Sequence, residues 1–216
     1  MRLQNGSSET SLKEVKEFSE WILSVGDGNA GGPNEGEAEI KVSNDILIEG
    51  KSDPIATIVE STYPLLKDHL WEPKYFQEMA ILAPTYEIVE MVNDYVLSHL
   101  PGEEKLYLSS DAISNVEGNL VASEIYSTKF LNIIRCSGLP NHHLRLKVGA
   151  PVMLLRNIDQ TSGLCNGTRL VIKHLGNRVI EAVVISGSNV GDKVFIPRMT
   201  LTPSDATRFP IKFQRR

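Results

Sequence analysis

Residues 144–172 read LRLKVGAPVMLLRNIDQTSGLCNGTRLVI, and they open a part of the chain in which short apolar runs alternate with turn residues. Four of these runs are predicted to be strands, at residues 150–157, 168–175, 178–186 and 193–201. The turns between them carry Asn166-Gly167, Gly176-Asn177 and the sequence GSNVGD. Four closely spaced strands joined by small turns predict a compact, partly open β-barrel.

Charge divides the chain where this strand pattern begins. Residues 1–140 contain 10 Lys and Arg against 23 Asp and Glu, a net charge of −13, whereas residues 141–216 contain 12 against 4, a net charge of +8. A basic surface attracts polyanions because binding releases the counterions around them. Nucleic acid is therefore the leading candidate partner for residues 141–216, although basic side chains also serve simply to solvate a surface.

Two helices are predicted before this module. An amphipathic helix begins at a capping box in residues 11–14 and ends at Gly26, and its apolar stripe is expected to pack on a core. A second helix opens with Asp53 as its N-cap and runs to about Thr62. Between them, residues 40–48 have the composition of a short strand.

A strand, a turn and a helix then follow in the order typical of α/β proteins. The apolar run at residues 79–85 predicts a buried parallel strand, and Thr85 is expected to cap a helix that ends at Pro101. Residues 105–113 are the next predicted strand. Together these elements form half of a βαβ unit, so the predicted fold class is α/β.

Gly50-Lys51-Ser52 resembles the end of a phosphate-binding P-loop. The full motif requires a glycine five residues earlier, where Asp45 stands, and a flexible loop where Ile46, Leu47 and Ile48 stand. The branched side chains resist the backbone shape of a P-loop, and the carboxylate repels phosphate. The sequence therefore favours an exposed turn.

Other partial motifs also lack what their chemistry requires. Residues 26–31 fit G-x-G-x-x-G, but they follow a helix rather than a strand and supply too few oxygen ligands for calcium. His142 and His143 are interpreted as exposed loop histidines, and Cys136 and Cys165 as reduced thiols. The sequence thus predicts no metal site, and its apolar runs are too short to predict a membrane-spanning helix.

Several segments resemble DNA helicases of the petite-integration-frequency (PIF) type, in particular the plant branch related to Helitron transposon helicases. The likeness rests on residues 144–172 and on VFIPRMTLTPSD at residues 194–205. Further matches, in family order, are SEWILSVGDGNAG, SDPIATIVESTYP, AILAPTYEIVEMVNDYVL and FLNIIRCSGLPNHHL. The resemblance implies a partial second RecA-like motor domain with an inserted small SH3-like β-barrel. Residues 1–140 would form the RecA-like part and the helices before it, residues 141–205 the barrel, and residues 206–216 the return to the RecA-like domain.

The resemblance also implies particular site residues. Five positions of the LLRN…GLCNGT motif become candidate DNA contacts: Arg156, Asn157, Asn166, Gly167 and Thr168. Asn166-Gly167 is equally consistent with a tight turn alone. Thr85 matches a contact to a backbone phosphate and also suits a plain helix N-cap. Arg2 matches the arginine that reaches the γ-phosphate of the nucleotide.

Members of this family couple ATP hydrolysis, with Mg²⁺, to 5′-to-3′ unwinding of DNA in repair, recombination and telomere maintenance. The resemblance therefore implies single-stranded DNA and the first motor domain as partners, and the nucleus as the location. Because residues 1–216 contain no complete P-loop, we expect neither tight binding of ATP and Mg²⁺ nor hydrolysis by this polypeptide alone. Two alternatives stay open, a non-enzymatic module that binds single-stranded DNA and a non-functional, transposon-derived fragment.

Overall fold

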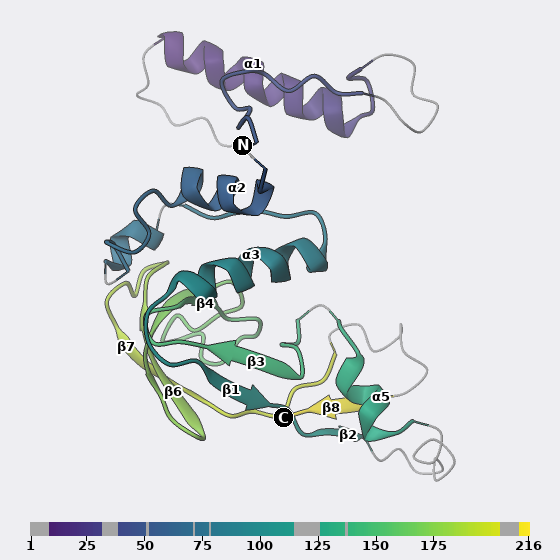
Figure 1. Ribbon diagram of the computed structural model, residues 1–216, viewed down its shortest axis with the longest axis vertical. Helices are drawn as coiled ribbons and strands as arrows, with labels where there is room; N and C mark the ends of the chain where they lie inside the picture. Colours follow the sequence, from purple (N-terminus) through teal and green to yellow (C-terminus); the bar gives the residue numbers. More distant parts are fainter. Residues whose placement is uncertain are drawn as a thin grey trace. The chain divides into compact units, whose positions relative to one another are not determined.

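The computed structural model describes residues 9–31, 39–50, 52–70, 72–77, 79–114, 126–136, 138–203 and 212–216. They belong to two compact units, Met1–Glu49 and Gly50–Arg216 (Figure 1). None of the described helices is long and apolar enough to cross a bilayer.

The smaller unit contains one helix, α1 (Glu9–Gly26), among its described residues. The predicted helix is confirmed, but the capping box is wrong, because Ser11 lies inside the helix rather than at its start. The strand predicted at residues 40–48 is also wrong. The amides of Ile46 and Leu47 donate to the carbonyl of Ser43 at 3.1 and 3.0 Å, so a local turn satisfies the backbone there.

Two helices of the larger unit begin at the polar caps that the sequence predicts, α2 (Pro54–Thr62) and α3 (Tyr86–His99). The 3₁₀ turn η1 (Pro73–Phe76) and the helix α5 (Thr128–Ile133) were not predicted. The carboxylate of Asp53 accepts from the amides of Ile55 and Ala56 at 3.0 and 3.1 Å, which confirms it as the N-cap of α2. In the same way the hydroxyl of Ser127 caps α5.

Residues 79–83 do not form the buried parallel strand that the apolar run predicts. The side chain of Leu82 is 94% exposed. The carbonyl of Met79 accepts from Arg169 Nη2 and from the hydroxyl of Tyr63, each at 2.9 Å, so side chains take the place of a neighbouring strand. A parallel strand requires strands on its flanks, and all the ladders in the described part of the chain are antiparallel.

The single strand predicted at residues 105–113 is in fact two strands, β1 (Lys105–Leu108) and β2 (Asp111–Ile113). β1 pairs with β3 (His143–Leu146), and β2 pairs with β8 (Phe213–Arg215), both antiparallel. The chain changes its pairing partner at two serines. The Ser109 amide donates to His142 O at 3.0 Å, and the Ser110 amide donates to Arg216 O at 2.7 Å. The expected βαβ unit is therefore wrong, although the mixed helix and sheet content is confirmed.

The four strands predicted after Pro140 are confirmed as one antiparallel sheet (Figure 1). In sheet order they are β4 (Pro151–Met153), β5 (Arg169–Leu175), β6 (Val179–Val184) and β7 (Lys193–Pro197). β4 is shorter than expected, because residues 154–157 turn away from it into a loop. In the described residues β4 and β7 are the two edges of the sheet and do not pair, so the structure shows an open four-stranded sheet and not the partly open, SH3-like β-barrel that was expected.

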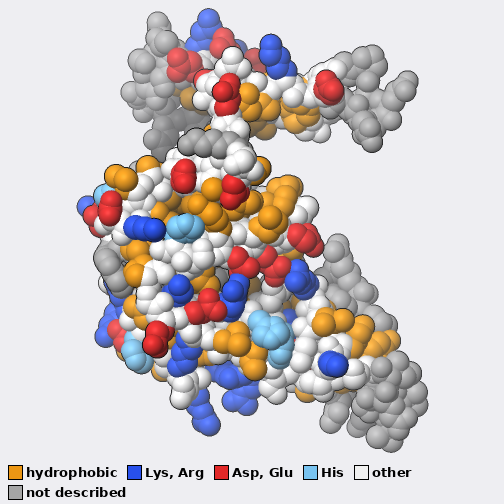
Figure 2. All heavy atoms as spheres, in the orientation of Figure 1, with side chains coloured by type: hydrophobic (Ala, Val, Ile, Leu, Met, Phe, Trp, Pro, Cys, Tyr) orange, Lys and Arg blue, Asp and Glu red, His pale blue; other side chains and the backbone are white. Residues whose placement is uncertain are grey.

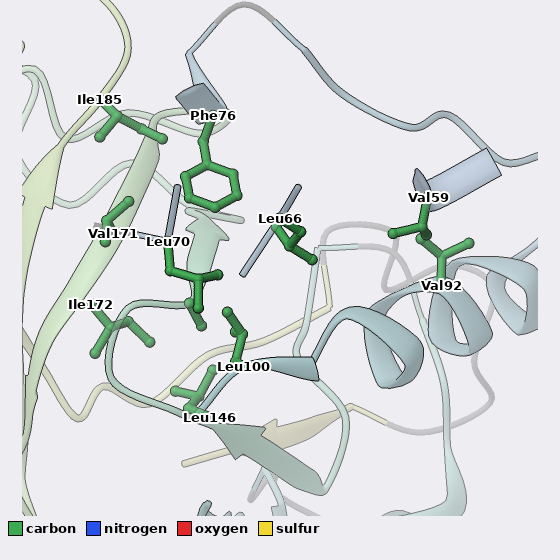
Figure 3. Packing of buried hydrophobic residues seen from close by; sticks show 11 residues of the cluster. Val59, Leu66, Leu70, Phe76, Val92, Leu100, Leu146, Val171, Ile172 and Ile185 are labelled. Atoms are coloured by element: carbon green, nitrogen blue, oxygen red, sulfur yellow. The ribbon is translucent and has the colours of Figure 1, made fainter. Parts of the chain in front are cut away.

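The main core of the larger unit joins residues from before and after Pro140. Phe76 and Leu70 lie beside Val171, Ile172 and Ile185 of the sheet region, Leu66 lies between this group and α3, and Val59 of α2 faces Val92 of α3 (Figure 3). A second cluster lies between the β4–β5 loop and the sheet, around Leu164, Leu170 and Val194. Part of the apolar surface of the sheet is thus buried by the helical part that precedes it.

Candidate nucleic-acid interface

The loop between β4 and β5, residues 154–168, contains five of the six predicted DNA contacts. At its base, the amide of Leu154 donates to Thr168 O at 2.9 Å and the amide of Gly167 donates to Leu154 O at 2.8 Å. Further out, the amide of Ile158 donates to Leu164 O, also at 2.8 Å. Leu154 and Leu164 are buried in the second core cluster. The loop is therefore a hydrogen-bonded structure with its own apolar anchor.

Asn157, Asn166 and Gly167 lie together on the exposed side of this loop. Asn157 Oδ1 accepts from the amide of Asn166 at 2.8 Å, which holds the turn at Asn166-Gly167. Gly167 has a φ of +88°, a backbone conformation that other residues rarely adopt, and the space beside its Cα is open. The tight turn that the sequence suggested is confirmed, and it leaves open space beside the Cα of Gly167, whose amide is engaged with Leu154 O.

Thr168 is buried, and its hydroxyl is already paired. Thr168 Oγ1 donates to Gly163 O at 2.8 Å and accepts from the amide of Cys165 at 3.0 Å. The side chain therefore supports the loop from inside and presents no hydroxyl to an external strand.

Arg156 is half-buried, and two backbone carbonyls orient its guanidinium. Arg156 Nε donates to Gly138 O at 3.2 Å, and Nη2 donates to Thr202 O. A guanidinium carries five N–H donors, so others remain for a ligand. An arginine held in this way is suited to a phosphate, because its planar fork matches phosphate oxygens.

Thr85 does not lie on this loop. Its exposed side chain caps α3, with Oγ1 accepting from the amide of Ile88 at 3.4 Å, which confirms the N-cap interpretation. Hydrogen bonds from its own amide and from the Thr85 hydroxyl lower the pKa of Glu87, so a carboxylate already lies at the start of α3. Tyr86 Oη donates to Cys136 O at 3.4 Å. The start of α3 and Arg156 therefore border the same segment, residues 136–138.

The outer tip of the loop carries an acidic residue, Asp159. Its carboxylate accepts from the Thr161 hydroxyl at 2.6 Å and from the Ser162 hydroxyl at 2.7 Å. These hydrogen bonds, with those from the two amides, lower the pKa of Asp159 to about 2. The loop thus carries a negative charge at Asp159 and a positive charge at Arg156.

We expect a carbon-13 NMR titration of the Asp159 carboxyl to give a pKa of about 2. Because the folded-state pKa lies below the ordinary value of about 3.9, the stabilisation of the tip is complete above that value. It is lost as the pH falls through the folded-state pKa. In Asp159→Asn the amide shifts of Thr161 and Ser162 should lose this pH dependence. An inflection at the ordinary carboxyl pKa would contradict the hydrogen bonding described here.

The basic residues after Pro140 do not form one continuous positive surface. Arg145 pairs with Asp94 and Glu104, Lys193 with Glu181, and Arg215 with Asp111. Over much of the visible face of the larger unit, blue and red side chains are interleaved, although several Lys and Arg gather at its lower edge (Figure 2). Acidic side chains thus neutralise some of the basic side chains after Pro140. The difference in net charge between the two parts of the sequence therefore does not produce a separate positive surface in the structure.

Two predicted motifs have definite outcomes in the structure. Beside Gly50-Lys51-Ser52, the N-terminus of α2 is already capped by the Asp53 carboxylate, which disfavours an anion at that position. His143 is the first residue of β3, so the loop interpretation is wrong for it, and half-buried His142 accepts or donates through Nδ1 to Ser109 Oγ at 2.8 Å.

The remaining predictions concern Arg2, the two cysteines and a metal site. Arg2 lies outside the described residues. Both cysteines are free, and burial raises the pKa of Cys136 despite the nearby Arg215 and Arg156. Among the residues that the structure describes, there is no group of three His, Cys, Asp or Glu that could hold a metal ion.

The pair formed by Asp111 and Arg215 could not be predicted from the sequence. Their side chains are 0% and 2% exposed, and the two residues are 104 positions apart in the chain. No spacing pattern reports such a contact, because it arises only when β2 and β8 pair.

One segment of the chain is similar to a helicase domain in a comparison with protein-family models. Residues 129–175, which include all but the first residue of α5 and the whole of β3, β4 and β5, match the model described as DNA helicase Pif1, 2B domain. The match contains Arg156, Asn157, Asn166, Gly167 and Thr168. These residues therefore belong to a helicase-related segment. No curated protein sequence matches the chain.

Solved structures of Pif1 helicases are similar to the chain at low identity. The Candida albicans enzyme is 18% identical, with a TM-score of 0.44 over 91% of this chain and 41% of its own. Bacteroides Pif1 with ADP-AlF4 is 19% identical, with a TM-score of 0.42 over 87% and 33%. Bacteroides Pif1 bound to single-stranded DNA is 19% identical, with a TM-score of 0.37 over 77% and 37%. The chain thus spans about a third to two fifths of these proteins, and the scores are too low to support a function by themselves.

Proposed function

We propose that the larger unit is the DNA-gripping part of a Pif1-type helicase and that it binds single-stranded DNA through the base of the β4–β5 loop. The observation that carries the proposal is the match of residues 129–175 to the Pif1 2B domain. The open sheet β4–β7 would then correspond to the inserted SH3-like module, and the preceding helices to part of the second RecA-like domain.

The geometry of the loop supports this proposal. Arg156 offers a guanidinium that two carbonyls hold in place, and the tight turn leaves open space beside the Cα of Gly167. Contacts to phosphates and to the backbone bind a strand without reading its sequence, as a motor that moves along DNA requires. A relative bound to single-stranded DNA is among the similar structures.

The activity of the whole enzyme is a further part of the proposal. It would be ATP-dependent, 5′-to-3′ unwinding of DNA, in the nucleus and in the service of repair, recombination or telomere maintenance. A relative solved with ADP-AlF4 is consistent with nucleotide use in the family. Residues 1–216 hold no complete P-loop, so we expect this polypeptide to bind DNA without hydrolysing ATP.

The test is fluorescence anisotropy of a labelled oligothymidine titrated with the chain at several salt concentrations. We expect Arg156→Ala to weaken binding about tenfold, the equivalent of about 1.4 kcal/mol. We also expect it to reduce the slope of log K against log salt by about 0.7, the value for one phosphate contact on a single strand. Arg178→Ala is the matched control, because it removes an exposed arginine outside the β4–β5 loop.

The outcomes separate the alternatives. Equal losses in both variants would show binding by net charge alone, and no binding by the unaltered chain would refute the proposal. An ATPase assay on the same preparation completes the test. Hydrolysis that Lys51→Ala abolishes would show that the partial P-loop motif is functional after all, whereas binding without hydrolysis supports a DNA-gripping module.

A further inference from the structure

Arg215 and Asp111 form a buried ion pair where β8 meets β2. Arg215 Nε lies 3.1 and 3.0 Å from the two carboxylate oxygens of Asp111, and Nη2 lies 2.7 Å from Oδ2. The two residues are also direct partners in the β2–β8 ladder. The buried charge is thus balanced by a bidentate contact, the geometry that such a pair needs to be tolerated.

The remaining donors of Arg215 bind three backbone carbonyls. Nη2 donates to Leu131 O at 2.9 Å, and Nη1 donates to Ile134 O at 3.2 Å and Pro140 O at 3.1 Å. These acceptors lie in the last turn of α5 and in the segment that follows it. One guanidinium therefore holds both ends of residues 131–140 against β8.

Both acceptors of Arg156 lie next to residues that Arg215 holds. Gly138 lies two positions before Pro140, whose carbonyl accepts from Arg215 Nη1. Thr202 follows Leu201, which exchanges two backbone hydrogen bonds with Arg215 at 2.7 and 2.8 Å. Arg215 thus determines, by its side chain and by its backbone, where the two carbonyls that orient Arg156 can lie.

We propose that Arg215, held by Asp111, is a positioning residue for the nucleic-acid interface: it fixes the two carbonyls that aim Arg156 at a phosphate of single-stranded DNA. This inference rests on the proposed function of the β4–β5 loop. Arg215 itself is too deeply buried to touch DNA. Its influence on binding passes through Arg156.

A double-mutant cycle on the same anisotropy assay tests the proposal. Arg215→Lys keeps the positive charge but cannot reproduce the bidentate contact and the three carbonyl contacts together. We expect R215K to weaken binding of the oligothymidine by roughly the same tenfold factor as R156A. We expect no further loss when R215K is added to R156A, because the two changes then disable one contact.

Val59→Ala is the control for general loosening. Val59 lies on α2, is 2% exposed, and packs in the main core, outside the cluster of Leu131, Leu139 and Phe213 that surrounds Arg215. We expect V59A to lower the unfolding midpoint while leaving DNA affinity unchanged, with all variants compared at a temperature where circular dichroism shows them folded. A loss of affinity in V59A equal to that in R215K would overturn the proposal, and so would additive effects of R215K and R156A.

A measurement on the unaltered chain covers the case in which R215K does not fold. The Nε–H of Arg156 should exchange with solvent more slowly than that of exposed Arg178, because it donates to Gly138 O. Equal exchange rates would overturn the proposal without any variant. If the unaltered chain binds no DNA, the proposed function fails; if it binds and only the cycle is additive, the function stands and the positioning role fails.

Discussion

Replacing Asp111 by alanine is expected to lower the free energy of unfolding by about 3–5 kcal/mol, because the change leaves the Arg215 charge buried without a counter-charge. The side chains of both residues are almost completely buried. Alanine also removes the side-chain contact between the ladder partners Asp111 and Arg215. Urea denaturation followed by circular dichroism measures the effect.

Asp192→Ala is the matched control for this prediction, since it removes the same carboxylate at an exposed position. It should change stability by no more than about 0.5 kcal/mol. The double variant Asp111→Leu with Arg215→Met should recover part of the loss, because it removes both buried charges together. A loss from D111A no larger than that from D192A would show that the pair does not form.

Replacing Phe76 by alanine is expected to cost about 3–5 kcal/mol, the usual range for removing a buried aromatic ring. Phe76 is 1% exposed and packs with Leu70 and Val171 in the main core. The ring lies between the helical part and the sheet (Figure 3). Its removal leaves a cavity at the point where these two parts share their burial.

Leu82→Ala is the control for the core, and it also tests the correction to the predicted strand. Leu82 is an apolar residue six positions along the chain, and it is 94% exposed. We expect its replacement to leave the unfolding midpoint in urea nearly unchanged. A loss as large as that from F76A would place Leu82 in a core, as a buried parallel strand requires.

Local signals were sufficient for α2, α3 and the four-stranded sheet. Asp53 and Thr85 act as N-caps because a side-chain oxygen can bind the nearby helix amides whatever the rest of the chain does. The β5–β6 and β6–β7 connections are short, so their turn residues already select antiparallel neighbours.

Local sequence patterns could not predict contacts between residues that are distant in the sequence. The apolar composition of residues 79–85 suits a strand, but a strand forms only where another edge is available to pair with it. Residues 105–113 read as one strand, yet their two halves bond to His142 and Arg216, which lie far along the chain. Whether the sheet closes is also a matter of long-range pairing.

The candidate site shows the same division. The motif around Arg156 and Asn166 was visible in the sequence, and the structure gathers it on one loop. The structure alone shows that Thr168 is buried, that Asp159 carries a negative charge at the tip, and that Arg145 is paired with acids from the other part of the chain. A count of charges cannot reveal which of them neutralise one another.

The sequence by itself determined the starts of α2 and α3, the tight turns and the antiparallel strands after Pro140, because each depends on neighbours a few positions away. Only the tertiary structure decided that β1 and β2 separate, that the sheet stays open, and that Asp111 meets Arg215. These features depend on hydrogen bonds and charges brought together across about half of the chain, for which the linear order carries no signal.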